Sequence, residues 1–194
     1  MIFIENKRKK SEGLIRKYPE AIILDFTSSG GEEYKQFSPF YPHGDIPVPF
    51  TNGFFAKSVE GVWQGLKVFE DQDIDIAKFG IDDMKNIKRS VRKNGQVRGH
   101  RKGVYGSELL NYHDARKKIY LKTYAWVLDH KLQSLLVKLL QLALERDLVF
   151  LDYETNTDIE NLKKPLSHAG LVKKYLEKKA PAIALKKTQP NLLF

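Results

Sequence analysis

Residues 148–153 read LVFLDY, an apolar run that ends in a carboxylate and a tyrosine. A run of this length and composition predicts a strand buried on both faces. Two comparable runs stand near the N-terminus, MIFIE at 1–5 and AIILDF at 21–26, with a short helical segment between them. We therefore expect one small sheet, built from an N-terminal β-α-β unit and this later strand.

Helical periodicity dominates the second half of the chain. Apolar side chains recur at helical spacing from about Asn111 to Arg146, which predicts one long helix or two helices end to end. A final helix is expected to begin at Pro165 or Ser167. The predicted fold class is thus α+β, with a single, predominantly helical domain over residues 1–180 and a flexible C-terminal tail at 181–194.

Three other segments have less regular patterns. The Pro and Gly spacing of 37–54 predicts an irregular loop held by its aromatic rings. Residues 70–90 mix charged and apolar side chains, and we expect them to form a helical segment. Glycines alternate with cations in 91–110, which predicts an ordered basic loop.

Composition excludes several classes of site. The chain has 194 residues and no cysteine, so disulfides, thiolate nucleophiles and cysteine-ligated metals are ruled out. The five histidines show no HxH or HxxxH spacing, and we expect neither a metal site nor a cofactor. No apolar run approaches the roughly 20 residues of a membrane span, and the N-terminus does not resemble a secretory signal. We expect a cytoplasmic protein with no membrane partner.

The charge balance favours polyanionic partners. Lys and Arg number 33 against 24 for Asp and Glu, a net charge of +9. Nucleic acid and phosphorylated nucleotides are the partners that such a balance suggests. The alternative is a solvated lysine-rich surface with no such role.

The segment SVEGVWQGLKVF, residues 58–69, predicts the site. Glu60, Gln64 and Lys67 recur at i, i+4 and i+7, which places them on one face of a helix beside Trp63. The adjoining stripe is apolar, so the helix would be packed on most sides and its polar face would line a site. A surface array of i, i+4 pairs is the alternative.

This segment resembles the signature of the NADAR (NAD- and ADP-ribose-associated) superfamily, which runs Glu, three residues, Gln, two residues, Lys and then an aromatic. FSPFY at 37–41 resembles the Phe-Ser-Asn-Phe-Tyr loop of that family, with Pro39 in place of Asn. The long helix that contains Lys131 and the segment SHAGLVKKYL at 167–176 resemble two further family motifs. Gly61 departs from the family, which usually has His at this position.

The NADAR resemblance implies an N-glycosidase that cleaves a ribose C1′–N bond. Its ligand would be an ADP-ribosylated base or a phosphoribosyl compound. Such cleavage needs a carboxylate near C1′, cations for phosphate and an aromatic platform for a base. We assign the catalytic roles to Glu60 and Lys67, and expect Ser38, Phe40, Tyr41, Trp63 and Gln64 to contact the substrate. Core packing is the alternative for each aromatic residue.

Two more segments carry candidate residues. The basic loop supplies Arg89, Arg92, His100 and Arg101, which we expect to bind phosphate; a solvated loop is the alternative. Asp152, Glu154 and Asp158 follow a buried strand, where ligands of open sheets bind, and could supply a second acid, although a surface turn is the favoured interpretation.

Two rival interpretations follow from the same sequence. The basic loop and exposed rings also suit a non-catalytic nucleic-acid-binding protein. The last residues, QPNLLF, resemble the short peptides that dock on bacterial or phage sliding clamps, which makes Gln189 to Phe194 a candidate partner-binding segment.

Overall fold

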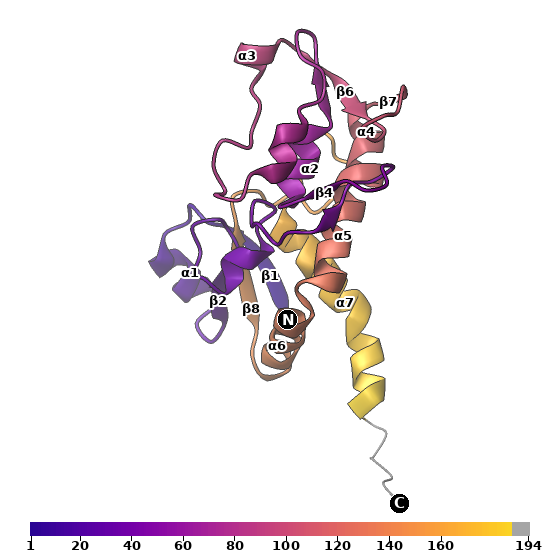
Figure 1. Ribbon diagram of the computed structural model, residues 1–194. Helices are drawn as coiled ribbons and strands as arrows, with labels where there is room; N and C mark the ends of the chain where they lie inside the picture. The colour runs from indigo at the N-terminus through magenta and orange to yellow at the C-terminus, as the bar shows by residue number, and fades with distance from the viewer. Residues whose placement is uncertain (188–194) are drawn as a thin grey trace, which may run out of the picture.

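The fold is organised around a parallel sheet of three strands in the order β1-β8-β2. A computed structural model describes residues 1–187, and Figure 1 shows the sheet beside α1 in the lower half of the molecule. The strands span Ile2–Asn6, Leu148–Asp152 and Ile22–Asp25 respectively, and α1 (Ser11–Lys17) connects the first N-terminal strand to the second. Every residue of β8 is buried.

This arrangement confirms the predicted α+β class and the predicted origin of the sheet. The later strand does more than join the N-terminal unit, because β8 inserts between β1 and β2 and pairs with both. Phe150 lies opposite Ile4 on one side and Leu24 on the other. An unbroken apolar run suits this central place, where both faces are covered.

The long helical segment is two helices end to end, as the periodicity allowed. α4 (Tyr112–Ala115) passes through a π-helical turn, Arg116–Tyr120, into α5 (Leu121–His130), and α6 (Gln133–Glu145) follows. The chain leaves helical geometry at Leu132, which separates α5 from α6. In Figure 1, α4 and α5 run from the upper half of the molecule towards the sheet.

Shorter elements build the upper half around α2 (Figure 1). They form a two-stranded sheet of β3 and β4 and a three-stranded sheet in the order β5-β6-β7. Their bounds are Ile46–Pro47 for β3, Phe55–Ala56 for β4, Val59–Gly65 for α2, Lys67–Phe69 for β5, Val91–Asn94 for α3, Val97–Arg101 for β6 and Leu109–Leu110 for β7. A 3-10 turn at Ile76–Gly80 contacts α2, and another at Tyr34–Phe37 contacts β2 and the final helix.

Three local predictions were wrong. The helix expected to reach Phe69 ends at Gly65, because the carbonyls of Gly65 and Leu66 accept hydrogen bonds from the N–H groups of Asp75 and Arg101. Residues 70–90 contain a 3-10 turn in place of the expected helix. The expected loop at 91–110 contains α3 and two strands, because β6 pairs with β5 and β7, whereas the expected loop at 37–54 is irregular apart from β3, which pairs with the nearby β4.

The final helix, α7 (His168–Lys187), begins where expected. The Ser167 hydroxyl accepts a hydrogen bond from the N–H of Gly170 at 3.0 Å, as an N-cap residue does. The helix continues past residue 181, where the sequence suggested that a tail begins. The suggested clamp-binding segment, Gln189 to Phe194, lies outside the described residues.

The core joins the sheet to the helices through stacked aromatic rings. Phe26 stacks on Phe150 with ring centroids 4.3 Å apart and on Phe37 at 4.6 Å. The hydroxyl of Tyr124, on α5, donates to the Phe37 carbonyl at 2.6 Å. Among residues 1–187, no helix combines the length and the apolar character needed to cross a membrane.

We predict that Phe150→Ala lowers the free energy of unfolding by about 3–5 kcal/mol, because it leaves a cavity among these rings. Urea denaturation measures the change. Leu144→Ala on α6 is the control, since Leu144 is 71% exposed and its truncation should cost less than about 0.5 kcal/mol. Equal losses in the two variants would contradict a core centred on Phe150.

Candidate functional site

A cavity of about 590 Å³ lies at the carboxyl ends of β2 and β8. Residues that follow the two strands, Thr27 and Glu154 among them, form one wall. The opposite wall comes from α2, β5 and β6, and the π-helical turn supplies Tyr120. The cavity therefore lies between the sheet and the upper half of the molecule, a common place for ligands in open sheets of parallel strands.

Glu60 projects into this cavity from the first turn of α2. Its side chain is largely buried, and Oε1 accepts a hydrogen bond from Gln64 Nε2 at 2.8 Å. Gln64 is held in turn, because its Oε1 accepts from the backbone N–H of Arg89 at 3.1 Å. Burial raises the pKa of Glu60, which the Gln64 hydrogen bond and the charges of Lys67 and Lys88 oppose.

The loop of 37–41 and α2 are joined directly. The N–H of Glu60 donates to the carbonyl of Pro39 at 2.8 Å. This bond satisfies a free N–H in the first turn of the helix. It also brings Ser38 and Phe40 into the same cavity wall as the carboxylate.

Two lysines face the carboxylate in the cavity. Lys67 begins β5, so it reaches the cavity from a strand and not from the helix face that the i, i+7 spacing suggested. Burial lowers the pKa of Lys67; the Glu60 charge opposes this shift, and the charges of Arg89 and Lys88 add to it. No salt bridge to the Lys67 ammonium is found in residues 1–187. Lys88 lies over the ring of Phe40, 5.2 Å from its centroid.

Aromatic rings cluster around Trp63. The imidazole of His100 stacks on the indole with ring centroids 3.7 Å apart, and Tyr112 and Tyr120 meet its edges at 6.0 and 5.7 Å. The indole is thus partly covered by protein, which leaves less of its surface for a base than the sequence suggested. Burial raises the pKa of the Tyr120 hydroxyl well above its usual range, and the charges of Glu60 and Asp152 add to this shift.

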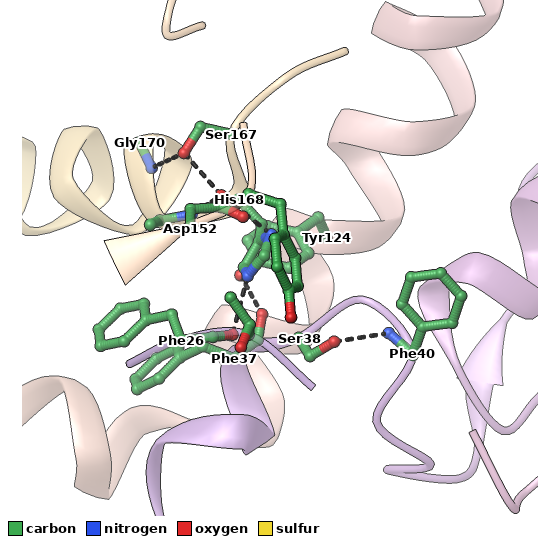
Figure 2. A network of polar contacts seen from close by, with 12 residues as sticks. Phe26, Phe37, Ser38, Phe40, Tyr124, Asp152, Ser167, His168 and Gly170 are labelled. Carbon is green, nitrogen blue, oxygen red and sulfur yellow. Dashed lines mark hydrogen bonds and ion pairs between the residues drawn. The ribbon is translucent and has the colours of Figure 1, made fainter. Parts of the chain in front are cut away.

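A buried polar network closes the sheet end of the cavity (Figure 2). Asp152 Oδ2 accepts hydrogen bonds from the Ser167 hydroxyl at 2.7 Å and the Ala169 N–H at 3.2 Å. His168 Nδ1 lies 3.1 Å from the same oxygen, and His168 Nε2 bonds to the Phe26 carbonyl at 2.8 Å. His168 therefore links the carboxylate at the end of β8 to the chain that follows β2.

Arg116 fixes the segment that leads from β8 to α7. Its guanidinium is buried and donates to the carbonyls of Ile159, Asn161 and Lys164, at 2.8–3.0 Å. A fourth bond reaches the Tyr112 hydroxyl at 2.9 Å. Arg116 and Tyr112 both line the cavity. Neither was predicted from the sequence, because the three carbonyls that Arg116 binds are more than forty residues away.

The structure distributes the expected site residues over three places. Those that line the cavity are Ser38, Phe40, Glu60, Trp63, Lys67 and His100. Gln64 and Arg89 lie behind this wall and hold Glu60 and β5 in place. Outside the wall are Tyr41, Arg92 and Arg101.

Most cations of the expected basic loop have intramolecular partners. Arg101 makes a two-pronged salt bridge with Asp73 at 2.6 and 2.7 Å. Arg98 pairs with Glu70 at 2.9 Å, and Arg89 donates to the carbonyls of Lys67 and Asp73 at 2.6 and 2.7 Å. These residues serve mainly to tie the chain together. In the described part of the chain, no cluster of three His, Asp or Glu side chains is placed to hold a metal ion.

The family to which the chain belongs is shown by a match to a protein-family model. A family model described as a family of unknown function (DUF6939) matches residues 6–172. The chain belongs to this DUF6939 family. No curated protein and no solved structure matches the chain.

The DUF6939 match corrects the NADAR resemblance, which was wrong. The structure gives physical reasons for the mismatch. A side chain at Gly61 would place its Cβ 2.8 Å from the carbonyl oxygen of Lys78, so a histidine does not fit there. Lys67, the lysine that carried the resemblance, begins β5 and does not continue the helix.

We predict that Asp152→Ala destabilises the DUF6939 chain by about 3–5 kcal/mol, because it leaves the Ser167 hydroxyl and the Ala169 N–H without their buried acceptor and removes the partner of His168. Thermal unfolding at neutral pH measures the loss. Glu154→Ala is the matched control, since Glu154 lines the same cavity and has no hydrogen-bond partner in residues 1–187. A stability loss below about 1 kcal/mol for Asp152→Ala would contradict an anchoring role.

Proposed function

We propose that this protein is an N-glycosidase that cleaves the ribose C1′–N bond of a phosphorylated, nucleoside-like compound. The observation that carries the proposal is the position of Glu60. Glu60 is 8% exposed and lines a ligand-sized cavity, and one oxygen of its carboxylate is held by Gln64. Cavities of roughly 300–1,000 Å³ are typical of small-molecule sites.

The chemistry requires a carboxylate in such a setting. As the C1′–N bond breaks, its electron pair leaves with the nitrogen and positive charge develops on C1′ and the ring oxygen. A buried carboxylate stabilises that charge more strongly than an exposed one. Water then bonds to C1′ and gives a proton to Glu60, from which the proton passes to the leaving group or to solvent.

The remaining cavity residues suit the rest of such a ligand. Lys67 and Lys88 supply positive charge for phosphate on the same side as Glu60. Phe40 offers a ring beside Lys88 on which a base can stack. An ADP-ribose-like or a phosphoribosyl compound satisfies these requirements.

The rival function, non-catalytic nucleic-acid binding, has less support from the geometry. Nucleic-acid binding would require cations of the basic loop that are free to bind phosphate. Three of the cations, Arg89, Arg98 and Arg101, already have partners within the protein. This function also gives no role to a buried carboxylate. Salt-dependent binding of DNA and RNA with no dependence on Glu60 would support it over the glycosidase.

We predict that Glu60→Gln lowers kcat at least about 100-fold on any substrate that the wild type hydrolyses, because the amide cannot stabilise positive charge or accept the proton. Base or ADP-ribose release is followed on a panel of phosphoribosyl compounds, NAD, and ADP-ribosylated DNA and RNA. Glu12→Gln on the exposed face of α1 is the control. An active Glu60→Gln enzyme, or a wild type inactive on the whole panel, counts against the proposal.

The pH dependence provides a second prediction. Activity requires ionised Glu60, so kcat/KM should fall as the pH drops through the pKa of this residue, which burial raises above 4.5. Lys67→Met removes a charge that lowers this pKa, and the acidic limb should therefore move to higher pH, while KM for a phosphorylated substrate rises roughly tenfold. Lys93→Met on α3 should change neither quantity. An unmoved limb in Lys67→Met would show that another group controls it.

A further inference from the structure

His100 is a buried imidazole with no polar partner in the protein. It lies near the end of β6, opposite Lys67 on β5 and Leu110 on β7. His100 is one of the residues that line the cavity, and it is 1% exposed. Within residues 1–187, neither Nδ1 nor Nε2 has a hydrogen-bond partner.

Such a group needs an explanation. Leaving a buried donor or acceptor unpaired destabilises a protein, and buried polar side chains are therefore nearly always hydrogen-bonded. His100 is fixed by its stack on Trp63 and by the strand pairing of β6, so it does not turn towards solvent. His100 is a residue of the cavity wall, so a ligand that packs against this wall is the candidate partner for the two nitrogens.

The charge state of His100 narrows the kind of ligand group. Burial lowers the pKa of His100 to about 3, and the nearby Lys67 charge acts in the same direction. The ring is therefore neutral at physiological pH, with one N–H donor and one acceptor nitrogen. A phosphate offers acceptors and suits the ammonium of Lys67, whereas a hydroxyl both donates and accepts and so suits the imidazole.

The position of His100 relative to Glu60 indicates which hydroxyl of the ligand the imidazole would bind. Trp63, on which His100 stacks, is one helical turn from Glu60 on α2. Lys67 lies close enough to influence both Glu60 and His100. If Glu60 faces C1′, the group next to it is the sugar, whose 2′-hydroxyl is on the adjoining carbon.

Building on the proposed function, we infer that His100 hydrogen-bonds the 2′-hydroxyl of the ligand and makes the cavity selective for ribose over 2′-deoxyribose. Sites built to bind a hydroxyl discriminate strongly against an analogue that lacks it, because their buried polar groups are then left unpaired. Lys67 holds the phosphate beside it. His100 is thus a specificity-determining residue and takes no part in phosphate binding.

Calorimetric titration of the full chain with ribose 5-phosphate and 2-deoxyribose 5-phosphate tests this inference. We expect the wild type to bind the ribose compound at least about tenfold more tightly. His100→Phe, which keeps a ring against Trp63, should bind both sugars within about twofold of each other. His100→Gln, which keeps one donor and one acceptor, should retain part of the preference. Thermal unfolding establishes that each variant is folded.

Three outcomes would overturn the inference: equal binding of the two sugars by the wild type, an unchanged preference in His100→Phe, or no binding of either sugar at millimolar concentration. Neither sugar phosphate contains an N-glycosidic bond, so the result does not depend on catalysis. A ribose preference that depends on His100, combined with no turnover of the substrate panel, would refute the glycosidase and leave this inference standing.

Discussion

The buried carboxylate of Asp152 is the interaction on which the rest of the architecture depends. It ends the central strand of the sheet and receives hydrogen bonds from the beginning of α7, through Ser167 and Ala169. Through His168 the same carboxylate is linked to the chain that follows β2. Negative charge at a helix N-terminus is favourable, so the strand end and the helix end stabilise each other. One side chain therefore aligns three segments that are far apart in the sequence.

The cavity follows from this alignment and from a second junction. The bond between the Glu60 N–H and the Pro39 carbonyl ties α2 to the loop that leads from the sheet. The two junctions hold opposite walls of one hollow, with Asp152 on one wall and Glu60 on the other. Their carboxylates differ in environment, because Asp152 is surrounded by donors whereas Glu60 accepts one hydrogen bond in the described part of the chain. That difference suits a structural role for the first and a chemical role for the second.

The sequence predicted those parts of the fold that depend on local pattern. Local pattern predicts the strands β1, β2 and β8 from their apolar runs and the helices α5 and α6 from their periodicity. Six of the expected site residues also line the cavity. The end of α2 was not predictable, because it depends on N–H groups supplied by Asp75 and Arg101 from other segments. Arg116 and Tyr120 were missed for a similar reason, since tertiary structure alone gives them their place. Residue spacing placed Lys67 correctly in the cavity for the wrong reason.

The π-helical turn at Arg116–Tyr120 has a consequence for how this chain tolerates a change in length. A π turn holds one residue more than an α turn, and each residue of a regular helix rotates the chain by about 100°. Loss of one residue here would leave a continuous α-helix, yet it would rotate Tyr112 and Arg116 away from Tyr120 and its neighbours. The guanidinium would then leave the three carbonyls that it holds. The π-helical turn thus fixes the rotation of α4 relative to α5, and a natural variant that lacks it would need other residues to line this side of the cavity.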